Sequence, residues 1–240
     1  MPPRSEEFDP FLSGLSSVDE VMNALDTAYP LATPIEKLDV ADELLRRRFF
    51  HSYSYFRFDQ DWSAAALRPI WDNLASPVRP DDILQFRRAA CSQQSIVFAE
   101  VAKRLGFTYA SVGLPNHFMA GVLIQGQWWV YDANKEVKVR RYPFAWLKQA
   151  DPRLARIYTP DYAPVLLAQS RKGQVSLHHV NTNPAPQATL LHKVTKLFSH
   201  FGWMLVLGLW AMLKLASLSA SQPRGETMRR NGPLPRPARP

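Results

Sequence analysis

Cysteine is nearly absent from this sequence, whose 240 residues include a single one, Cys91. One thiol cannot form an internal disulfide, and it cannot supply the paired thiolates of a structural zinc site. Disulfide-rich secreted scaffolds and zinc ribbons are therefore excluded. His178 and His179 are neighbours in a predicted strand and point to opposite faces, so they do not form a joint metal site. We expect neither a metal nor a cofactor.

A cleavable signal peptide is also missing from the sequence as given. The first residues, MPPRSEEFDPFLSG, carry acidic groups where a secretory signal has a positive start followed by an apolar run. There are no internal repeats. We therefore expect synthesis into the cytosol. The content of hydrophobic residues, 46%, is enough for a folded core.

Basic residues are scarce in the first part of the chain, although the formal net charge is +8. Residues 1–134 contain 12 Lys and Arg against 17 Asp and Glu, whereas residues 135–240 contain 17 against 4. The positive charge therefore belongs to the C-terminal part. Nucleic-acid binding through this basic part remains an open but disfavoured alternative, because no aromatic residues are interleaved with the arginines of the tail.

Helices are predicted in the first half of the chain from their start signals and apolar spacing. Residues 17–20 and 33–36 are capping boxes, in which a hydroxyl and a carboxylate satisfy free N–H groups at a helix start. The second box predicts a helix through Arg48. A longer helix is predicted over residues 91–105, where Gly106 ends it.

Extended segments are predicted on both sides of the helix over residues 91–105. Gln125-Gly126 is a two-residue hairpin signal, because glycine tolerates a positive φ. The predicted strands and extended arms are residues 51–58, 107–112, 117–124, 127–131, 165–169 and 174–180.

A long apolar segment lies near the C-terminus. Residues 201–220 contain one charge, Lys214, and as a helix they span about 30 Å, which is the thickness of the hydrocarbon layer of a bilayer. We predict a single membrane span there, and an interfacial helix remains the alternative. Residues 181–200 are predicted to be a linker, and residues 221–240, with five Arg and five Pro, a disordered basic tail.

Three residues are placed as a thiol nucleophile and its partners require. Cys91 opens a helix, and a helix N-terminus stabilises a thiolate. His117 begins a strand, and Asp132 follows the next one. With Gln125 and Gly126 as the loop, Asp132 pairs opposite Met119, so His117 and Asp132 are diagonal neighbours on one face of the hairpin. A register slip of one residue would separate them.

These residues predict a mechanism. His117 takes the Cys91 proton or pairs with the thiolate and later protonates the leaving amine, and Asp132 fixes the imidazole ring. The Cys91 backbone N–H and one side chain would stabilise the oxyanion. Gln85 is the candidate side chain, and Trp128 and Trp129 are candidates to line a substrate groove. The alternatives to Gln85 are Tyr53, Tyr55, Gln93 and Gln94.

The motifs around these residues resemble those of a known family. The segments are ACSQQ at residues 90–94, NH at 116–117 and GQWWVYD at 126–132. Together they resemble the core of the transglutaminase-like branch of papain-fold cysteine enzymes. Members often carry a proline after the aspartate, where this chain has Ala133. The resemblance spans residues 81–133 and implies a Cys91, His117, Asp132 triad.

The resemblance also implies a fold and an activity class. We expect an α+β, papain-like core in which the helix bearing Cys91 packs on an antiparallel sheet bearing His117 and Asp132. The expected activity is hydrolysis of an amide or isopeptide bond, or acyl transfer to an amine, on a peptide or protein substrate. A catalytically silent peptide-binding module of the same fold is the alternative.

The expected domain organisation follows the chain order. Residues 1–29 form a helical lead and residues 30–180 the catalytic domain. The linker, the membrane helix and the basic tail then complete the chain. Lipid is the expected partner of residues 201–220 and of the flanking Lys and Arg. We expect the catalytic domain on the cytoplasmic side, because no signal peptide precedes it in the sequence as given. The positive-inside bias favours the opposite orientation, because five arginines follow the helix and only two lysines, Lys193 and Lys196, lie close before it.

Overall fold

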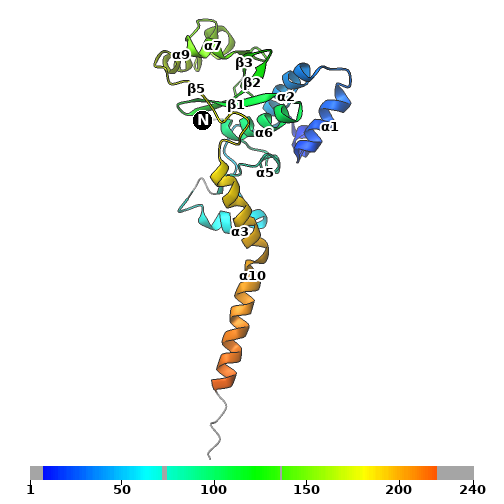
Figure 1. The fold of residues 1–240 in the computed structure, drawn as a ribbon, viewed down its shortest axis with the longest axis vertical. Helices are drawn as coiled ribbons and strands as arrows, with labels where there is room; N and C mark the ends of the chain where they lie inside the picture. The colour runs from blue at the N-terminus through cyan, green and yellow to red at the C-terminus, as the bar shows by residue number, and fades with distance from the viewer. Residues whose placement is uncertain (1–7, 72–74, 136, 221–240) are drawn as a thin grey trace, which may run out of the picture. The chain divides into compact units, whose positions relative to one another are not determined.

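A computed structural model of the chain describes residues 8–71, 75–135 and 137–220, the last three of these without side chains. The predicted tail, residues 221–240, lies outside the described residues. The chain divides into two compact units, residues 1–198 and 199–240. The first unit is α+β, as expected, and contains every described strand (Figure 1).

Helices fill the first part of this unit, and their starts follow the predicted capping signals. Both halves of the Thr33 capping box are formed, whereas at the first box the Ser17 hydroxyl accepts from the Glu20 N–H and the Glu20 carboxylate turns to Ser16. The elements are η1 (Pro10–Gly14), α1 (Val18–Ala28), α2 (Pro34–Arg48), α3 (Phe58–Leu67), α5 (Pro80–Leu84) and α6 (Cys91–Arg104).

The sheet follows in the order β4-β3-β2-β1-β5, with every neighbouring pair antiparallel. Gln125 and Gly126 both have positive φ, 51° and 80°, which closes the hairpin of β2 and β3 at the predicted turn. The later elements are β1 (Thr108–Leu114), β2 (His117–Ile124), β3 (Gln127–Tyr131), β4 (Tyr142–Pro143), α7 (Phe144–Lys148), α8 (Leu154–Ile157), α9 (Ala163–Arg171), β5 (Ser176–His178) and α10 (Pro186–Ala220).

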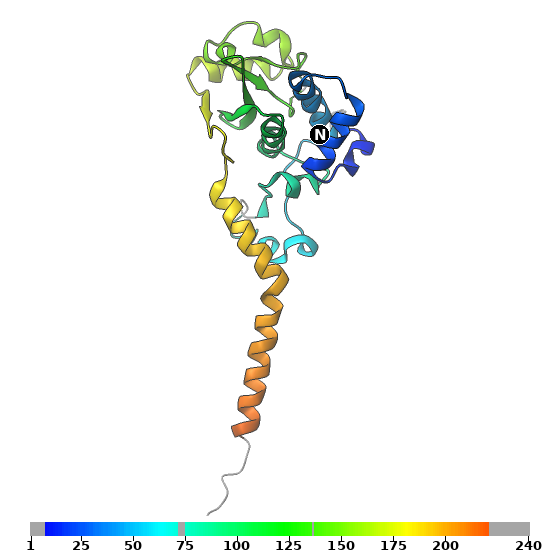
Figure 2. The ribbon, with the colours of Figure 1, turned by 45° about the vertical axis from the view of Figure 1, so that its right-hand side comes forward.

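Helices cover both faces of the sheet (Figure 2). On one face, α1, α2 and α6 share a core with side chains such as Val122 and Tyr131. On the other face, α7, α8 and α9 pack on Val112, Met119 and Val130. The alternation of buried side chains along each strand thus produces two apolar layers with the sheet between them.

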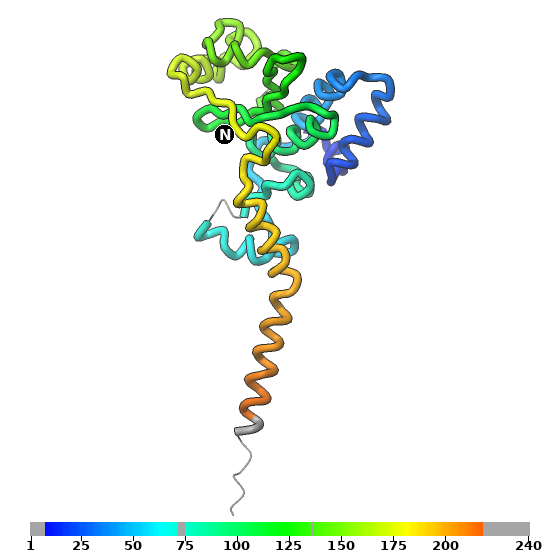
Figure 3. Tube along the Cα trace, in the orientation of Figure 1, coloured from blue at the N-terminus to red at the C-terminus, as the bar shows by residue number. Residues whose placement is uncertain are grey.

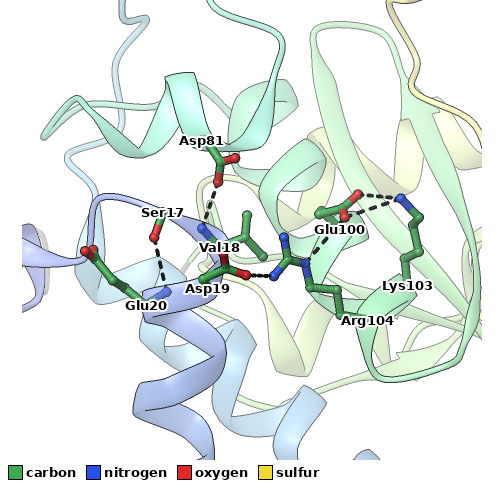
Figure 4. A network of polar contacts seen from close by, with 8 residues as sticks. All are labelled: Ser17, Val18, Asp19, Glu20, Asp81, Glu100, Lys103 and Arg104. Carbon is green, nitrogen blue, oxygen red and sulfur yellow. Dashed lines mark hydrogen bonds and ion pairs between the residues drawn. The ribbon is translucent and has the colours of Figure 1, made fainter.

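A polar network fastens α1 to α5 and α6 (Figure 4). Asp81 accepts a hydrogen bond from the Val18 N–H at 2.9 Å, and Asp19 forms an ion pair with Arg104. Arg104 also lies within ion-pair distance, 3.5 Å, of Glu100 one turn earlier on α6. These contacts fix the N-terminal helix against the helix that begins at Cys91.

Arg48 is the largest fully buried side chain of the helical layer, with 1% of its surface exposed. Its guanidinium donates to the backbone carbonyls of Leu15, Leu84 and Phe86. Burial, followed by the positive charge of Arg87, lowers the pKa of Arg48 to about 10. The side chain therefore joins the end of α2 to the residue that follows η1 and to the end of α5.

The structure differs from the sequence predictions in one strand assignment. Residues 165–169 belong to α9, in which Ala163, Leu166 and Ser170 are buried at helical spacing and Pro164 occupies the first turn. A short apolar run does not distinguish a buried strand from a buried helix, and here the helix forms because only one side of the run meets the core. For residues 51–58 a strand or an extended arm was predicted. Residues 51–57 form an arm that leads into α3, which begins at Phe58, and one bridge joins the preceding Phe50 to Arg88.

Helix α10 begins earlier than the predicted membrane segment (Figure 3). Within the first unit, His192 is fully buried against the ring of Phe56, and Lys196 forms an ion pair with Asp82. Part of the segment predicted as a linker is thus helical and packed. In the second unit the helix is apolar, and Pro186–Ser217 is long and apolar enough to cross a membrane by length and composition.

We expect Arg48→Met to lower the free energy of unfolding by about 3 kcal/mol, because several buried carbonyls would lose their donor. Urea unfolding of the full chain in detergent micelles, followed by tryptophan fluorescence, measures this change. Arg47→Met is the matched control, because Arg47 pairs with Asp9 at the surface and its loss should cost less than about 1 kcal/mol. Equal effects of the two substitutions would contradict the assignment.

Candidate active site

Cys91 is the first residue of α6 and is half-buried. The N–H groups in the first turn of a helix have no partner within the helix, and their dipoles favour a negative charge nearby. The turn is held by Gln93, whose side-chain oxygen accepts from the Ala90 N–H at 3.0 Å. The sulfur therefore lies at the end of a helix whose first turn is tightly anchored.

His117 and Asp132 meet as the hairpin register predicted. Ile124 pairs with Gln127 and Ala120 with Tyr131, so the register places Asp132 just past the paired strand and diagonal to His117. The His117 Nε2 lies 2.8 Å from the Asp132 Oδ2, and both side chains are buried. The backbone N–H of Lys135 donates to the other carboxylate oxygen at 3.3 Å.

The Cys91 thiol and the His117 imidazole share a hydrogen bond. Because Nε2 faces Asp132, Nδ1 is the ring nitrogen left for the sulfur. Burial raises the pKa of the Cys91 thiol, but the hydrogen bond and charge of His117, together with the Phe118 N–H, outweigh it and bring the pKa below the usual value. Burial lowers the pKa of His117, but the charge and hydrogen bond of Asp132 outweigh it and raise the pKa to about 9. Both shifts favour the charged forms, thiolate and imidazolium, over those of an isolated cysteine and histidine.

Three tyrosines that the sequence analysis did not identify surround this pair. The Tyr158 hydroxyl donates to the Asp132 Oδ2 at 2.9 Å and lies 2.6 Å from the Tyr142 hydroxyl. The ring of Tyr162 meets the His117 imidazole edge-on, with ring centroids 5.5 Å apart. Tyr142 lies in a two-residue strand and the other two near short helices, so no periodic pattern marked them as neighbours of the triad.

A second carboxyl group lies near Asp132. Asp42, on α2, is buried, and the desolvation together with the charge of Asp132 raises its pKa well above the usual range. The raised pKa favours the neutral acid over the carboxylate at this position, and so limits the negative charge beside Asp132.

The glutamine side chains considered as oxyanion donors all donate hydrogen bonds to backbone carbonyl groups. Gln85 is exposed at the end of α5, and its amide group donates to the Ser16 carbonyl at 2.8 Å. The amide of Gln93 donates to the Ser54 and Pro77 carbonyls, and that of Gln94 donates to the Ala89 carbonyl. An oxyanion role for Gln85 stays a prediction.

The remaining candidates are aromatic residues. Tyr53 is exposed, and its ring lies 6.2 Å from that of the partly buried Tyr55. Trp128 and Trp129 are both half-buried on opposite faces of β3. Trp129 packs against the α6 core and carries the Arg141 guanidinium over its ring. A substrate-groove role for either tryptophan stays a prediction.

Within the described residues, no three His, Cys, Asp or Glu side chains are arranged to hold a metal ion. His178 and His179 lie with their ring centroids 6.1 Å apart, and both are exposed.

We expect the rate of Cys91 alkylation by iodoacetamide to rise at a pH below the usual thiol pKa. His117→Ala removes the hydrogen bond and charge that lower this pKa but leaves the burial that raises it. The rate at pH 7 should then fall by about tenfold or more, because each unit of pKa changes the thiolate fraction about tenfold. His178→Ala, at an exposed histidine, is the control, and equal rates in wild type and His117→Ala would refute the ion pair.

Comparison with known proteins gives one match. Residues 81–194 match the family model described as the transglutaminase-like superfamily. No curated protein and no solved structure matches the chain. The matched residues run from α5 into the first turns of α10 and include α6, all five strands and the three residues of the site. Residues 81–194 of this chain are therefore a domain of the transglutaminase-like superfamily.

Proposed function

We propose that this protein is a thiol enzyme that acts on an amide or isopeptide bond of a peptide or protein, by hydrolysis or acyl transfer, and that α10 tethers it to a membrane. Cys91 is the nucleophile, His117 the proton carrier and Asp132 the group that orients the imidazole. The observation that supports the proposal best is the continuous hydrogen-bonded series from Asp132 through His117 to Cys91 at a helix start.

The first half-reaction forms an acyl-enzyme. The Cys91 thiolate attacks the carbonyl carbon, and a C–S bond forms as the carbonyl electrons move to oxygen. As this intermediate collapses, the C–N bond breaks, and the His117 imidazolium gives its proton to the departing nitrogen. The products are a thioester on Cys91, a free amine and a neutral imidazole.

The second half-reaction releases the acyl group. Water or an amine attacks the thioester while neutral His117 accepts its proton, and the C–S bond breaks to return the thiolate. Water yields a carboxylic acid, and an amine yields a new amide. Asp132 stabilises the imidazolium in both half-reactions, and its hydrogen bond from Tyr158 holds the carboxylate in place.

The oxyanion formed in each half-reaction requires donors. The backbone N–H of Cys91 lies at the open end of α6, where helix geometry leaves it without a partner in the helix. We propose it as the first donor. Gln85 is the proposed second donor and would have to leave the Ser16 carbonyl when substrate binds.

Membrane tethering is supported by the apolar part of α10. Pro186–Ser217 meets the length and composition of a membrane-crossing helix. The described side chains from Trp203 to Ser217 are all exposed, so the protein itself does not bury them. We propose a single pass with the transglutaminase-like domain on the cytoplasmic side.

Mass spectrometry of the full chain tests the enzymatic proposal directly. The protein, in detergent micelles, is incubated with a library of glutamine-containing and isopeptide-linked peptides and quenched in acid. We expect an acyl adduct on the Cys91 peptide, with release of ammonia or an amine, and no adduct in Cys91→Ala. Adding a primary amine in excess distinguishes transfer, which gives a new amide, from hydrolysis.

The absence of an acyl adduct on Cys91 would favour the alternative function. An unlabelled Cys91 that also resists electrophilic peptide probes, in both membrane and soluble fractions, would favour the silent peptide-binding module. The hydrogen bond between Cys91 and His117 supports the enzyme, because a binding module has no need to keep this pair aligned.

We expect Tyr158→Phe to lower kcat about fivefold to tenfold with KM unchanged, because it removes a hydrogen bond worth about 1 kcal/mol from the carboxylate that orients His117. Steady-state kinetics with a labelled peptide substrate and the alkylation rate of Cys91 measure the effect. Tyr29→Phe, at an exposed tyrosine, is the control. A change in KM alone would contradict a positioning role.

A further inference from the structure

The region of α3 exposes an unusual amount of apolar surface. Four large side chains there, and one from the first unit's part of α10, have exposed fractions of 40% or more: Phe58 (70%), Trp62 (40%), Ile70 (74%), Trp71 (61%) and Phe198 (45%). Single exposed apolar residues need no explanation, but a group of them indicates a surface that is covered in use. We call these five residues the α3 patch.

The patch is fixed to α10 within the first unit. The Thr195 hydroxyl donates to the Asp61 carboxylate at 2.7 Å, and the Ser63 hydroxyl donates to the Thr195 carbonyl at 2.9 Å. The rings of Trp62 and Phe198 lie with their centroids 5.4 Å apart. Because Asp61 and Ser63 are buried, α3 is held rigidly against this part of the helix.

The patch is also close to the apolar segment along the chain. Phe198 precedes Phe201, the first residue of that segment, by three positions. Three residues of any conformation span at most about 11 Å. If residues from Phe201 onward enter a bilayer, its surface therefore lies within about that distance of Phe198, whatever direction the helix takes after the first unit.

Positive charge adjoins the patch. Arg57 and Arg68 flank α3 and line a cavity of about 710 Å³ together with Arg87 and Arg88. The Arg68 guanidinium lies over the ring of Tyr55 at 3.8 Å, and Arg57 pairs with Asp59. In the part of the chain that the structure describes, no carboxylate forms an ion pair with Arg87 or Arg88. The cavity therefore has donors for an anion, and its charge matches that of phosphate headgroups.

We propose that the α3 patch lies in the surface layer of the same bilayer that α10 enters, and that the arginines of this cavity bind phosphate groups of its lipids. The inference rests on the proposed membrane tether. Tryptophan and phenylalanine beside arginine are the composition of interfacial helices, whose rings lie at headgroup depth while their cations contact phosphate. The domain is then held at the membrane by two contacts, which restricts its orientation and presents the site to substrates near the surface.

The single cysteine of the chain makes a site-specific test possible. In a Cys91→Ser background, one nitroxide label is attached at a time through Phe58→Cys, Trp71→Cys, Leu31→Cys or Leu207→Cys. The full chain is reconstituted in vesicles of phosphatidylcholine with phosphatidylglycerol. Power saturation then compares collisions of the label with oxygen, which concentrates in lipid, and with a water-soluble nickel chelate. Leu31 is the matched control, because it is apolar and 97% exposed but lies between α1 and α2.

We expect labels at positions 58 and 71 to favour oxygen, the label at 31 to favour the nickel chelate, and the label at 207 to lie deepest. Aqueous labels at 58 and 71 with a lipid-embedded label at 207 would overturn the docking inference and leave the tether intact. An aqueous label at 207 would refute the tether and, with it, this inference.

Phosphate binding by the arginines of the cavity is tested separately, by the depth of the label at position 71. Replacing Arg87 and Arg88 by glutamine should move the label at position 71 toward water, and so should replacing the anionic lipid by phosphatidylcholine. The control replaces Lys138 and Arg140, which are exposed between β3 and β4, by glutamine. An unchanged depth in both tests would refute phosphate binding by the cavity. Capture of soluble inorganic phosphate with no dependence on lipid would assign the cavity to a free anion instead.

Discussion

The hydrogen bond between His117 and Asp132 is the constraint on which the candidate site depends. This hydrogen bond depends on the two-residue loop between β2 and β3. Gln125 and Gly126 take positive φ, and this two-residue loop fixes which residues of β2 and β3 face each other. A side chain changes face with every residue, so a loop one residue longer would place the imidazole and the carboxylate on opposite sides of the sheet. The packing of α6 on β2 then brings the Cys91 sulfur to the ring.

Burial gives this arrangement its electrostatic character. His117 and Asp132 are nearly inaccessible to water, so their attraction is weakly screened and raises the pKa of the imidazole to about 9 against the effect of desolvation. Burial and the charge of Asp132 also raise the pKa of the neighbouring acid Asp42, which favours its neutral form. The Asp132 carboxylate balances the imidazolium, and Tyr158 and the Lys135 N–H donate hydrogen bonds to its oxygens.

The side chains of helix α10 are partly buried at its start and exposed further along it. Its first turns are part of the folded first unit, where His192 and Thr195 are buried and Lys196 pairs with Asp82. Beyond Phe198 its side chains are apolar and largely exposed. The family model also extends to residue 194, so the start of the helix belongs to the matched domain and not to a separate linker segment.

The sequence by itself determined the features that depend on neighbouring residues. Capping signals and apolar spacing predicted α2 and α6, the Gln125-Gly126 pair predicted the hairpin, and the hairpin register predicted that His117 and Asp132 share a face. These features are local because helix starts and two-residue turns are decided within a few residues. The motif around Asp132 added the family, and the family model supports it.

Only the tertiary structure decided which distant groups surround the site. Tyr158 and Tyr162 reach it because α8 and α9 fold over one face of the sheet, and Tyr142 reaches it from β4. Nothing in their local sequence specifies this packing. The same packing made residues 165–169 a helix, since a short apolar run fits either structure until its neighbours are known. The exposed α3 patch and its attachment to Thr195 likewise follow from contacts between segments more than a hundred residues apart, which no sequence period records.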